Sequence, residues 1–109
     1  MIDTHGKAGA DAAASVVGGV LPITQTTFFG DGTLDLPSQR RALEFMVDAG
    51  SNTICILANF SEQFSLTDVE RNDLFDVAID QVAGRVPVIG TASHFSARVA
   101  AQQWRQAQA

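Results

Sequence analysis

Polar residues and one carboxylate follow an apolar run in the stretch ILANFSEQFSLTDVER, residues 56–71. Asn59 can donate from its side-chain amide, Ser61 from its hydroxyl and Phe60 from its backbone N–H. These groups could bind an anion such as a carboxylate, so they are candidate ligand-binding residues. Glu62 could act as a general base, but a lone carboxylate after a strand more often holds its loop by accepting from amides. We therefore expect a structural role for Glu62.

Two other segments, QTTFFGDG at residues 25–32 and TASHFS at 91–96, also carry groups that could contact a ligand. Thr26 and Thr27 could bond a ligand or merely end a strand, and the residues alone leave both interpretations open. His94 lies among serines, but a nucleophile pair also needs an orienting acid. A loop histidine that bonds the backbone is the simpler interpretation of His94.

No pattern in the chain indicates a metal or a nucleotide cofactor. His5 and His94 are far apart, and neither a phosphate loop nor a GxGxxG fingerprint is present. His5 is expected to be solvated. Twelve acidic and seven basic residues give a formal net charge of -5, which argues against a nucleic-acid partner.

The single cysteine, Cys55, lies in an apolar run, and we expect it to be a buried thiol. A lone cysteine fits a reducing compartment, so a cytoplasmic location is expected. The sequence contains neither a run of 18 apolar residues, as a membrane span requires, nor the pattern of a secretory signal.

Strand and helix signals alternate along the chain and place these polar segments in loops. Strands are expected at 16–24, 52–58 and 85–90, and helices at about 36–49, from Thr67 to Gly84, and from Ser96 to the end. Phe95 and Trp104 are expected in the core. The alternation predicts parallel strands joined by helical crossovers, with the polar segments at the carboxyl ends of the strands, where α/β proteins bind ligands.

Capping signals support the helix boundaries. Asp35 can cap the first helix, with Pro37 in its first turn and Gly50 at its left-handed end. Thr67 and Glu70 match a capping box. The first helix has one apolar stripe, formed by Leu36, Leu43, Met46 and Val47. Residues 1–15 are expected to be a flexible extension, and 16–109 to be the folded part.

Three ordered blocks between residue 18 and about 102 resemble the dihydrodipicolinate synthase and N-acetylneuraminate lyase family of Schiff-base (β/α)8 barrels. They are GVLPITQTTFFGDGTLD, ALEFMVDAGSNTICILANFSEQFSLTDVER and VAGRVPVIGTASHFSARVA. The family's Thr-Pro-Phe element and Asp-Gly turn correspond to Thr26, Thr27, Phe28, Asp31 and Gly32. Its Gly-Thr-Thr-Gly-Glu motif corresponds to Ala58, Asn59, Phe60, Ser61 and Glu62. These substitutions, with HFS after the third strand, look like the branch that contains L-2-keto-3-deoxyarabonate dehydratase.

The resemblance implies an α/β fold in which residues 16–109 form the first three βα units of an incomplete TIM barrel. It implies a lysine imine that acts on a 2-keto acid, no cofactor, and a homotetramer for the whole enzyme. The family's catalytic lysine and tyrosine come from later strands, beyond Ala109, whereas this sequence has no tyrosine and only Lys7. We expect the isolated chain to be inactive.

Other functions remain open at this point. A 4-hydroxy-tetrahydrodipicolinate synthase or an aldolase of the same family is one alternative, and a non-catalytic module that binds a carboxylate is another. An incomplete barrel leaves strand edges unpaired, so the isolated chain is expected to be partly folded or to self-associate.

Overall fold

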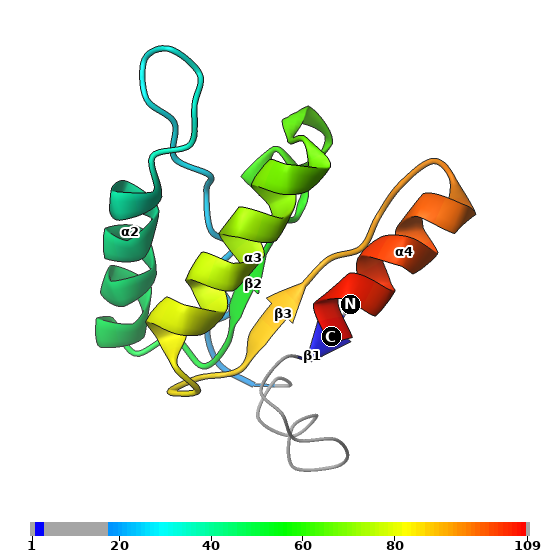
Figure 1. The fold of residues 1–109 in the computed structure, drawn as a ribbon. Coiled ribbons are helices and arrows are strands. Elements are labelled where there is room, and N and C mark those ends of the chain that lie inside the picture. The colour runs from blue at the N-terminus through cyan, green and yellow to red at the C-terminus, as the bar shows by residue number, and fades with distance from the viewer. Residues whose placement is uncertain (1, 4–17, 109) are drawn as a thin grey trace.

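The computed structural model of the protein describes residues 2–3 and 18–108. Strands and helices alternate over most of this length, as predicted (Figure 1). The elements are β1 (Ile2–Asp3), α2 (Leu36–Asp48), β2 (Ile54–Ile56), η1 (Asn59–Ser61), η2 (Gln63–Ser65), α3 (Asp68–Val82), β3 (Val88–Gly90) and α4 (Ala97–Gln108). The rest of the predicted extension, and the start of the first predicted strand, lie outside the described residues.

The strands β2 and β3 form the parallel centre of the sheet. Ile54 lies opposite Val88, and Ile56 lies opposite Gly90. All three residues of β2 are buried, including Cys55. This confirms the predicted buried strand and buried thiol, and burial raises the pKa of Cys55.

The first predicted strand is present only as an extended segment with one bridge, from Ile23 to Cys55. Cys55 N donates to Pro22 O and Thr24 N donates to Cys55 O, both at 2.9 Å. Pro22 has no N–H to extend this ladder. The segment therefore runs parallel to β2 without forming a longer strand.

Before Pro22, the side chain and the backbone of Asn52 bond the backbone of Val20 in place of a regular strand ladder. Val20 N donates to Asn52 Oδ1 at 2.9 Å, and Asn52 N donates to Val20 O at the same distance. Gly19 has φ +83°, and a Cβ there would lie 1.9 Å from Asn52 Oδ1. Only glycine fits at this approach.

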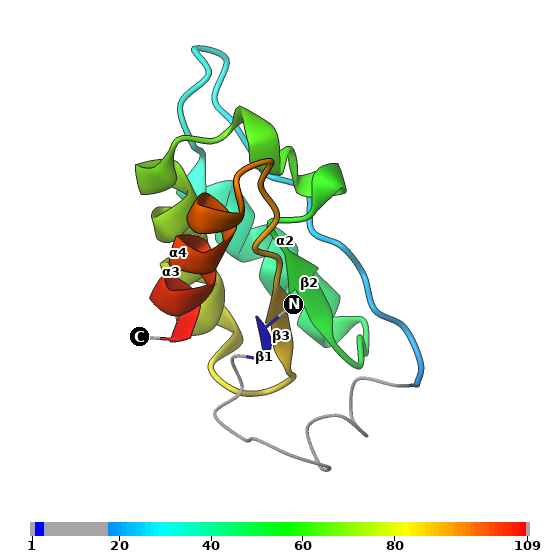
Figure 2. The same cartoon turned by 90° about the vertical axis from the view of Figure 1, so that its right-hand side faces the viewer.

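Within the predicted extension, the structure describes only the short strand β1. Ile2 pairs with Gly90, and Asp3 pairs with Ile89, in antiparallel register. The order β1-β3-β2 therefore covers the outer edge of β3 (Figures 1 and 2). Unpaired N–H and C=O groups at an edge favour such pairing.

The core lies between β2, β3 and the two helices α2 and α3, which lie side by side (Figure 1). Its centre is formed by Leu43, Ile54 and Val82, all with no exposed surface. The predicted stripe of α2 is confirmed, because Leu36, Met46 and Val47 pack against this cluster. The helix starts are also confirmed: Asp35 accepts from Ser38 N, and Thr67 and Glu70 form the capping box.

The expectation that Phe95 and Trp104 are core residues is wrong. Phe95 is 94% exposed and Trp104 is 44% exposed. The helix α4 has no buried residue, contacts β1 and contributes no side chain to the core cluster between α2 and α3 (Figure 1). Phe95 instead stacks on Phe64 with a ring-centroid distance of 5.2 Å.

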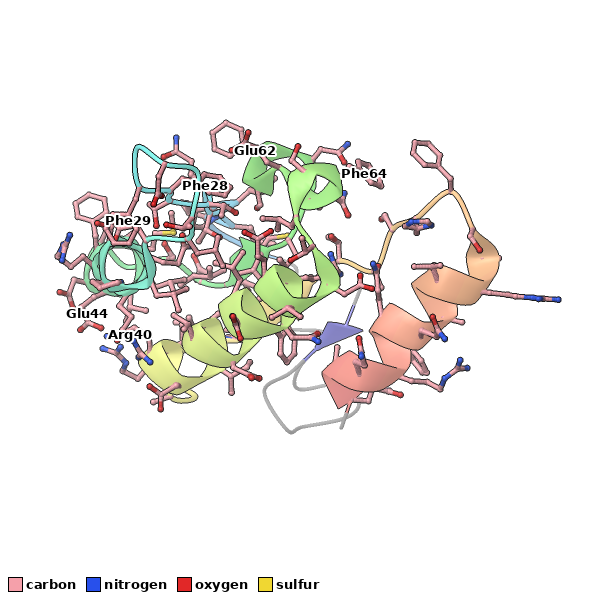
Figure 3. All side chains as sticks on the ribbon, turned by 45° about the horizontal axis from the view of Figure 1, so that its top comes forward. Phe28, Phe29, Arg40, Glu44, Glu62 and Phe64 are labelled. Atoms are coloured by element: carbon pink, nitrogen blue, oxygen red, sulfur yellow. The ribbon has the colours of Figure 1, made fainter. Side chains whose placement is uncertain are left out.

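Charged side chains join α2 to the end of α3. Arg85 donates from Nη1 and Nη2 to the two carboxylate oxygens of Glu44, at 2.9 and 2.6 Å. Gln81 Nε2 donates to Glu44 Oε2 at 2.9 Å, and Arg40 pairs with Asp80 at 2.6 Å (Figure 3 labels Arg40 and Glu44). The bonds from Arg85 and Gln81 lower the pKa of Glu44 to about 2.

We predict that Leu43→Ala destabilises the fold strongly, whereas Phe45→Ala on the same helix does not. Leu43 is 0% exposed, so its truncation should cost about 2–5 kcal/mol of unfolding free energy. Phe45 is 73% exposed, so its truncation should change that free energy by less than about 0.5 kcal/mol. Urea unfolding followed by circular dichroism measures both. Equal losses would contradict the described core.

We also predict an acid sensitivity that depends on Glu44. Because folding lowers the pKa of Glu44 from 4.5 to about 2, its ionised form stabilises the fold above pH 4.5, and this contribution is lost as the pH falls toward 2. Glu44→Gln should therefore lose less stability than the unmodified chain between these pH values. Urea midpoints across this range provide the measurement. As a control, Glu62→Gln removes a carboxylate that has no hydrogen-bond partner within the described residues, and an equal effect there would refute the assignment to Glu44.

Candidate functional site

The three polar segments gather at the carboxyl ends of β2 and β3, where the loops rise above the sheet (Figure 1). Thr26 Oγ1 donates to Ser61 O at 2.6 Å, and Ser61 Oγ donates to Thr24 O at 2.5 Å. Thr91 Oγ1 donates to Leu57 O. Hydrogen bonds therefore join the loop after β2 to the segment around Thr26 and to the segment that begins at Thr91.

Left-handed residues stand on both sides of the loop 58–61. Leu57 has φ +59° and Glu62 has φ +58°. For a residue with a Cβ, the left-handed conformation is less stable than the right-handed one by roughly 1–2 kcal/mol. Leu57 is held there because its side chain is 3% exposed and its carbonyl accepts from Thr91. The loop conformation is thus imposed by its surroundings.

The short helix η1 leaves donors unused at its start. Ser61 N donates to Ala58 O and Glu62 N donates to Asn59 O, both at 3.0 Å. Within the described residues, the amides of Asn59 and Phe60 have no hydrogen-bond partner. Asn59 Oδ1 accepts from Gln63 Nε2 at 2.7 Å, which leaves Asn59 Nδ2 as a further donor.

The hydroxyl of Ser61 is not available in the way the sequence suggested. Ser61 is 1% exposed, and its Oγ already donates to Thr24 O. The site therefore offers donors from Asn59 and Phe60, and Ser61 positions the loop that carries them.

The predicted mechanism for Glu62, a carboxylate that accepts from loop amides, is not observed. Its side chain is exposed, and within the described residues its carboxylate has no hydrogen-bond partner (Figure 3). The residue contributes instead through its backbone, as the left-handed link between η1 and η2. By contrast, Glu70 accepts from Thr67 N at 2.9 Å and Glu70 N donates to Thr67 Oγ1 at 3.1 Å, as predicted.

Thr27 is held by a residue that sequence analysis missed. Gln39 is 4% exposed, and its Oε1 accepts from Thr27 N at 3.0 Å, while the Thr27 hydroxyl donates to Asp35 O at 2.7 Å. Its Nε2 donates to Gln25 O at 3.0 Å. The signal was present, because Gln39 lies three residues after Leu36 and four before Leu43, on the apolar stripe.

His94 has the loop role that was the simpler interpretation. Its Nδ1 accepts from Ser96 N at 2.9 Å, and its side chain is exposed. The ring lies 6.3 Å from that of Phe95 in an edge-on arrangement. Phe60 and Phe64 are also more than half exposed, so this rim is rich in aromatic surface.

Arg71 links α3 to the end of β3. The residue is 8% exposed, and its Nη2 donates to Thr91 O. Burial lowers the pKa of Arg71. Because Thr91 in turn donates to Leu57, Arg71 helps to fix the strand ends from which the loop 58–61 begins.

His5 and Lys7 lie outside the described residues. Among the residues that the structure describes, no group of three or more His, Cys, Asp and Glu side chains is placed to hold a metal ion. The helices in the same part of the chain are too short or too polar to cross a membrane.

Solved structures share this arrangement of elements. A prophage protein of the dihydrodipicolinic acid synthase family from E. coli K12, in complex with pyruvate, superposes with a TM-score of 0.80 at 30% identity. The alignment covers 85% of this chain and 31% of that one. Dihydrodipicolinate synthase from Aquifex aeolicus gives 0.79 at 26% identity, over 83% of this chain and 30% of that one. These neighbours are TIM barrels, and the described chain is part of such a barrel.

Sequence relatives point to the same family. L-2-keto-3-deoxyarabonate dehydratase from Azospirillum brasilense is 56% identical over 90 residues, which cover 83% of this chain and 29% of that enzyme. 4-Hydroxy-tetrahydrodipicolinate synthase from Polynucleobacter asymbioticus is 35% identical over 83 residues, 76% of this chain and 27% of that enzyme. The chain thus spans less than a third of the length of these relatives. Because residues 16–109 match the Dihydrodipicolinate synthetase family, the chain belongs to that family of lyases and synthases.

Proposed function

We propose that the whole protein is a lyase that removes water from a 2-keto-3-deoxy sugar acid through a lysine imine. The observation that carries this proposal is the 56% identity to L-2-keto-3-deoxyarabonate dehydratase over 90 of the 109 residues. An alignment of that extent includes the loop 58–61, where the sequence departs from the Gly-Thr-Thr-Gly pattern.

The proposed chemistry needs a nitrogen nucleophile. A lysine amine attacks the keto carbon and water leaves, which gives an imine that withdraws electrons from C3. A base then removes a proton from C3, hydroxide leaves from C4 and is protonated to water, and hydrolysis of the imine returns the lysine. This chain has no tyrosine, and its only lysine is Lys7 in the N-terminal segment. The reacting lysine and the proton-relay tyrosine are therefore proposed on later strands.

This chain would supply part of the carboxylate site. The amides of Asn59 and Phe60, which have no partner among the described residues, and Asn59 Nδ2 are available donors for the substrate carboxylate. Thr26 and Ser61 hold the loop by the bonds already described. The small-molecule partner is thus a 2-keto acid, and a homotetramer in the cytoplasm is proposed for the whole protein.

A synthase is the second candidate, because the relatives at 32–39% identity include several 4-hydroxy-tetrahydrodipicolinate synthases. Aldolase activity is the third. The lower identity of the synthases places them behind the dehydratase. Carbon–carbon bond formation from pyruvate, in place of water loss, would favour a synthase or an aldolase.

Borohydride trapping tests the imine. The 109-residue chain, incubated with pyruvate or a 2-keto-3-deoxy sugar acid and then reduced, should show no mass adduct, whereas the whole protein should gain one on a lysine of a later strand. Intact and peptide mass spectrometry are the measurements. An adduct on Lys7 or on the N-terminal amine would show that the lysine assignment is wrong.

Substitutions at the loop test the carboxylate site in the whole protein. Asn59→Asp keeps the acceptor for Gln63 but replaces the Nδ2 donor by an anionic oxygen, so KM for the 2-keto acid should rise at least about tenfold. Phe60→Ala keeps the backbone amide and should change KM by less than about threefold. Steady-state kinetics measure both. A KM for Asn59→Asp that equals the unmodified value would exclude this residue from carboxylate binding.

A further inference from the structure

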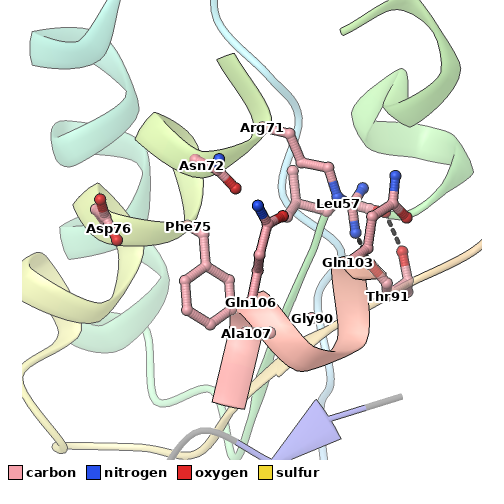
Figure 4. A pocket seen from close by; sticks show the side chains of 10 residues that line it. All are labelled: Leu57, Arg71, Asn72, Phe75, Asp76, Gly90, Thr91, Gln103, Gln106 and Ala107. Carbon is pink, nitrogen blue, oxygen red and sulfur yellow. Dashed lines mark hydrogen bonds between the residues drawn. The ribbon is translucent and has the colours of Figure 1, made fainter. Parts of the chain in front are cut away.

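A pocket of about 280 Å³ lies between α3 and α4, on the helix side of β3 (Figure 4). Arg71, Asn72, Phe75 and Asp76 line it from α3, and Gln103 and Gln106 line it from α4. The donors of Asn59 and Phe60 do not line it. It is therefore separate from the proposed carboxylate site.

The buried guanidinium of Arg71 has N–H donors without a partner among the described residues. A guanidinium carries five N–H donors, and within the described residues only Nη2 of Arg71 has a partner, the carbonyl of Thr91. No carboxylate of the described residues lies within ion-pair distance of Arg71. Asp68 acts on the charge of Arg71 from beyond that distance. A cation that is 8% exposed and has no paired carboxylate among the described residues favours the entry of an anion.

Gln103 contributes a hydrogen-bond acceptor that has no donor among the described residues. Its Oε1 is buried and has no hydrogen-bond partner within the described residues. A buried acceptor without a partner is energetically unfavourable. Gln103 and Arg71 both line the pocket, from α4 and α3 respectively (Figure 4). A ligand that satisfies both must carry an anionic acceptor and a hydrogen-bond donor close together.

The charge of Arg71 also restricts which group of the ligand can serve as the hydrogen-bond donor to Gln103. An ammonium group on the carbon next to the carboxylate would lie near the guanidinium and be repelled, whereas a hydroxyl would not. Asp76 lies at the other end of the pocket, five residues further along α3 and so about 7.5 Å along its axis. Its carboxylate disfavours a second negative charge on the ligand.

The wall between these two ends is apolar. Phe75 lies between Arg71 and Asp76 in Figure 4. A Cβ at Gly90 would lie 3.3 Å from Phe75 Cε2, so the glycine leaves room for this ring against the strand. The pocket thus has a cationic end, an apolar side and an anionic rim.

We propose that this pocket binds a small monocarboxylate that has a hydroxyl on the adjacent carbon. The carboxylate accepts from the Arg71 guanidinium, and the hydroxyl donates to Gln103 Oε1. The site is additional to the proposed lyase function, and neither depends on the other.

Glycolate is the direct probe, because acetate differs from it only by the missing hydroxyl. In the ¹⁵N-labelled whole protein, glycolate should cause saturable shifts of the Arg71 Nε–Hε and the Gln103 side-chain amide signals. Glycolate should bind on the order of fivefold more tightly than acetate, as one added hydrogen bond gives. Succinate should bind more weakly than acetate because its second carboxylate approaches Asp76.

Two variants separate the contributions. Gln103→Leu keeps the side-chain volume and removes the unpaired acceptor, so glycolate and acetate should bind with equal affinity. Arg71→Lys keeps the charge but loses the planar fork, so both should bind more weakly. Arg41→Gln removes an exposed cation of α2 outside the pocket and should leave both affinities unchanged.

The proposal is overturned if glycolate causes no saturable shift at these signals, or if it binds no more tightly than acetate. It is also overturned if Gln103→Leu keeps the preference for glycolate, since the glycolate hydroxyl would then not donate to Gln103 Oε1. Because the assay needs no lysine imine, each of these results leaves the trapping experiment on the whole protein unaffected.

Discussion

The parallel strand β2 is buried on both faces, and the other described elements are arranged around it. One edge of β2 bonds the extended segment at residues 22–24, and the other pairs with β3. One face receives Leu43 of α2 and Val82 of α3. A strand of three residues has only a few ladder bonds, so burial of its side chains provides much of its stabilisation.

The same arrangement brings the polar loops together. Because β2 and β3 are parallel, their carboxyl ends meet, and Thr91 at the end of β3 can bond Leu57 at the end of β2. Most hydroxyls at this edge already bond the backbone, among them those of Thr26 and Ser61. Among the described residues, the amides of Asn59 and Phe60 are donors at this edge that have no partner. A small number of placed donors is what a carboxylate site requires.

The described part of the barrel also shows how open sheet edges are treated. The outer edge of β3 is covered by β1, two residues that pair in the antiparallel direction. The other edge is not covered in the same way, because Val20 is 65% exposed and Ile23 is 42% exposed. In closed (β/α)8 barrels both edges pair with further parallel strands. The contrast is consistent with a chain that spans about 30% of its relatives.

The sequence by itself determined the order of the helices α2, α3 and α4 and of the strands β2 and β3, the caps at the starts of α2 and α3, and the family. Periodicity of apolar residues located α2 and α3, and side chains that bond their own neighbourhood, such as Asp35 and Thr67, fixed the helix starts. The resemblance to the family rests on ordered blocks of residues, which need no coordinates. The candidate loop 58–61 followed from its place after a buried strand.

Only the tertiary structure decided which polar groups are free and which aromatic rings are buried. Ser61 and Gln39 have partners more than ten residues away in sequence, and Phe95 is exposed on the loop before α4. Arg71 and Gln103 line the same pocket only because the fold places α4 opposite α3 across it. The physical reason is range: capping and periodicity act within a few residues, whereas burial and hydrogen-bond satisfaction depend on segments that meet only in the folded chain.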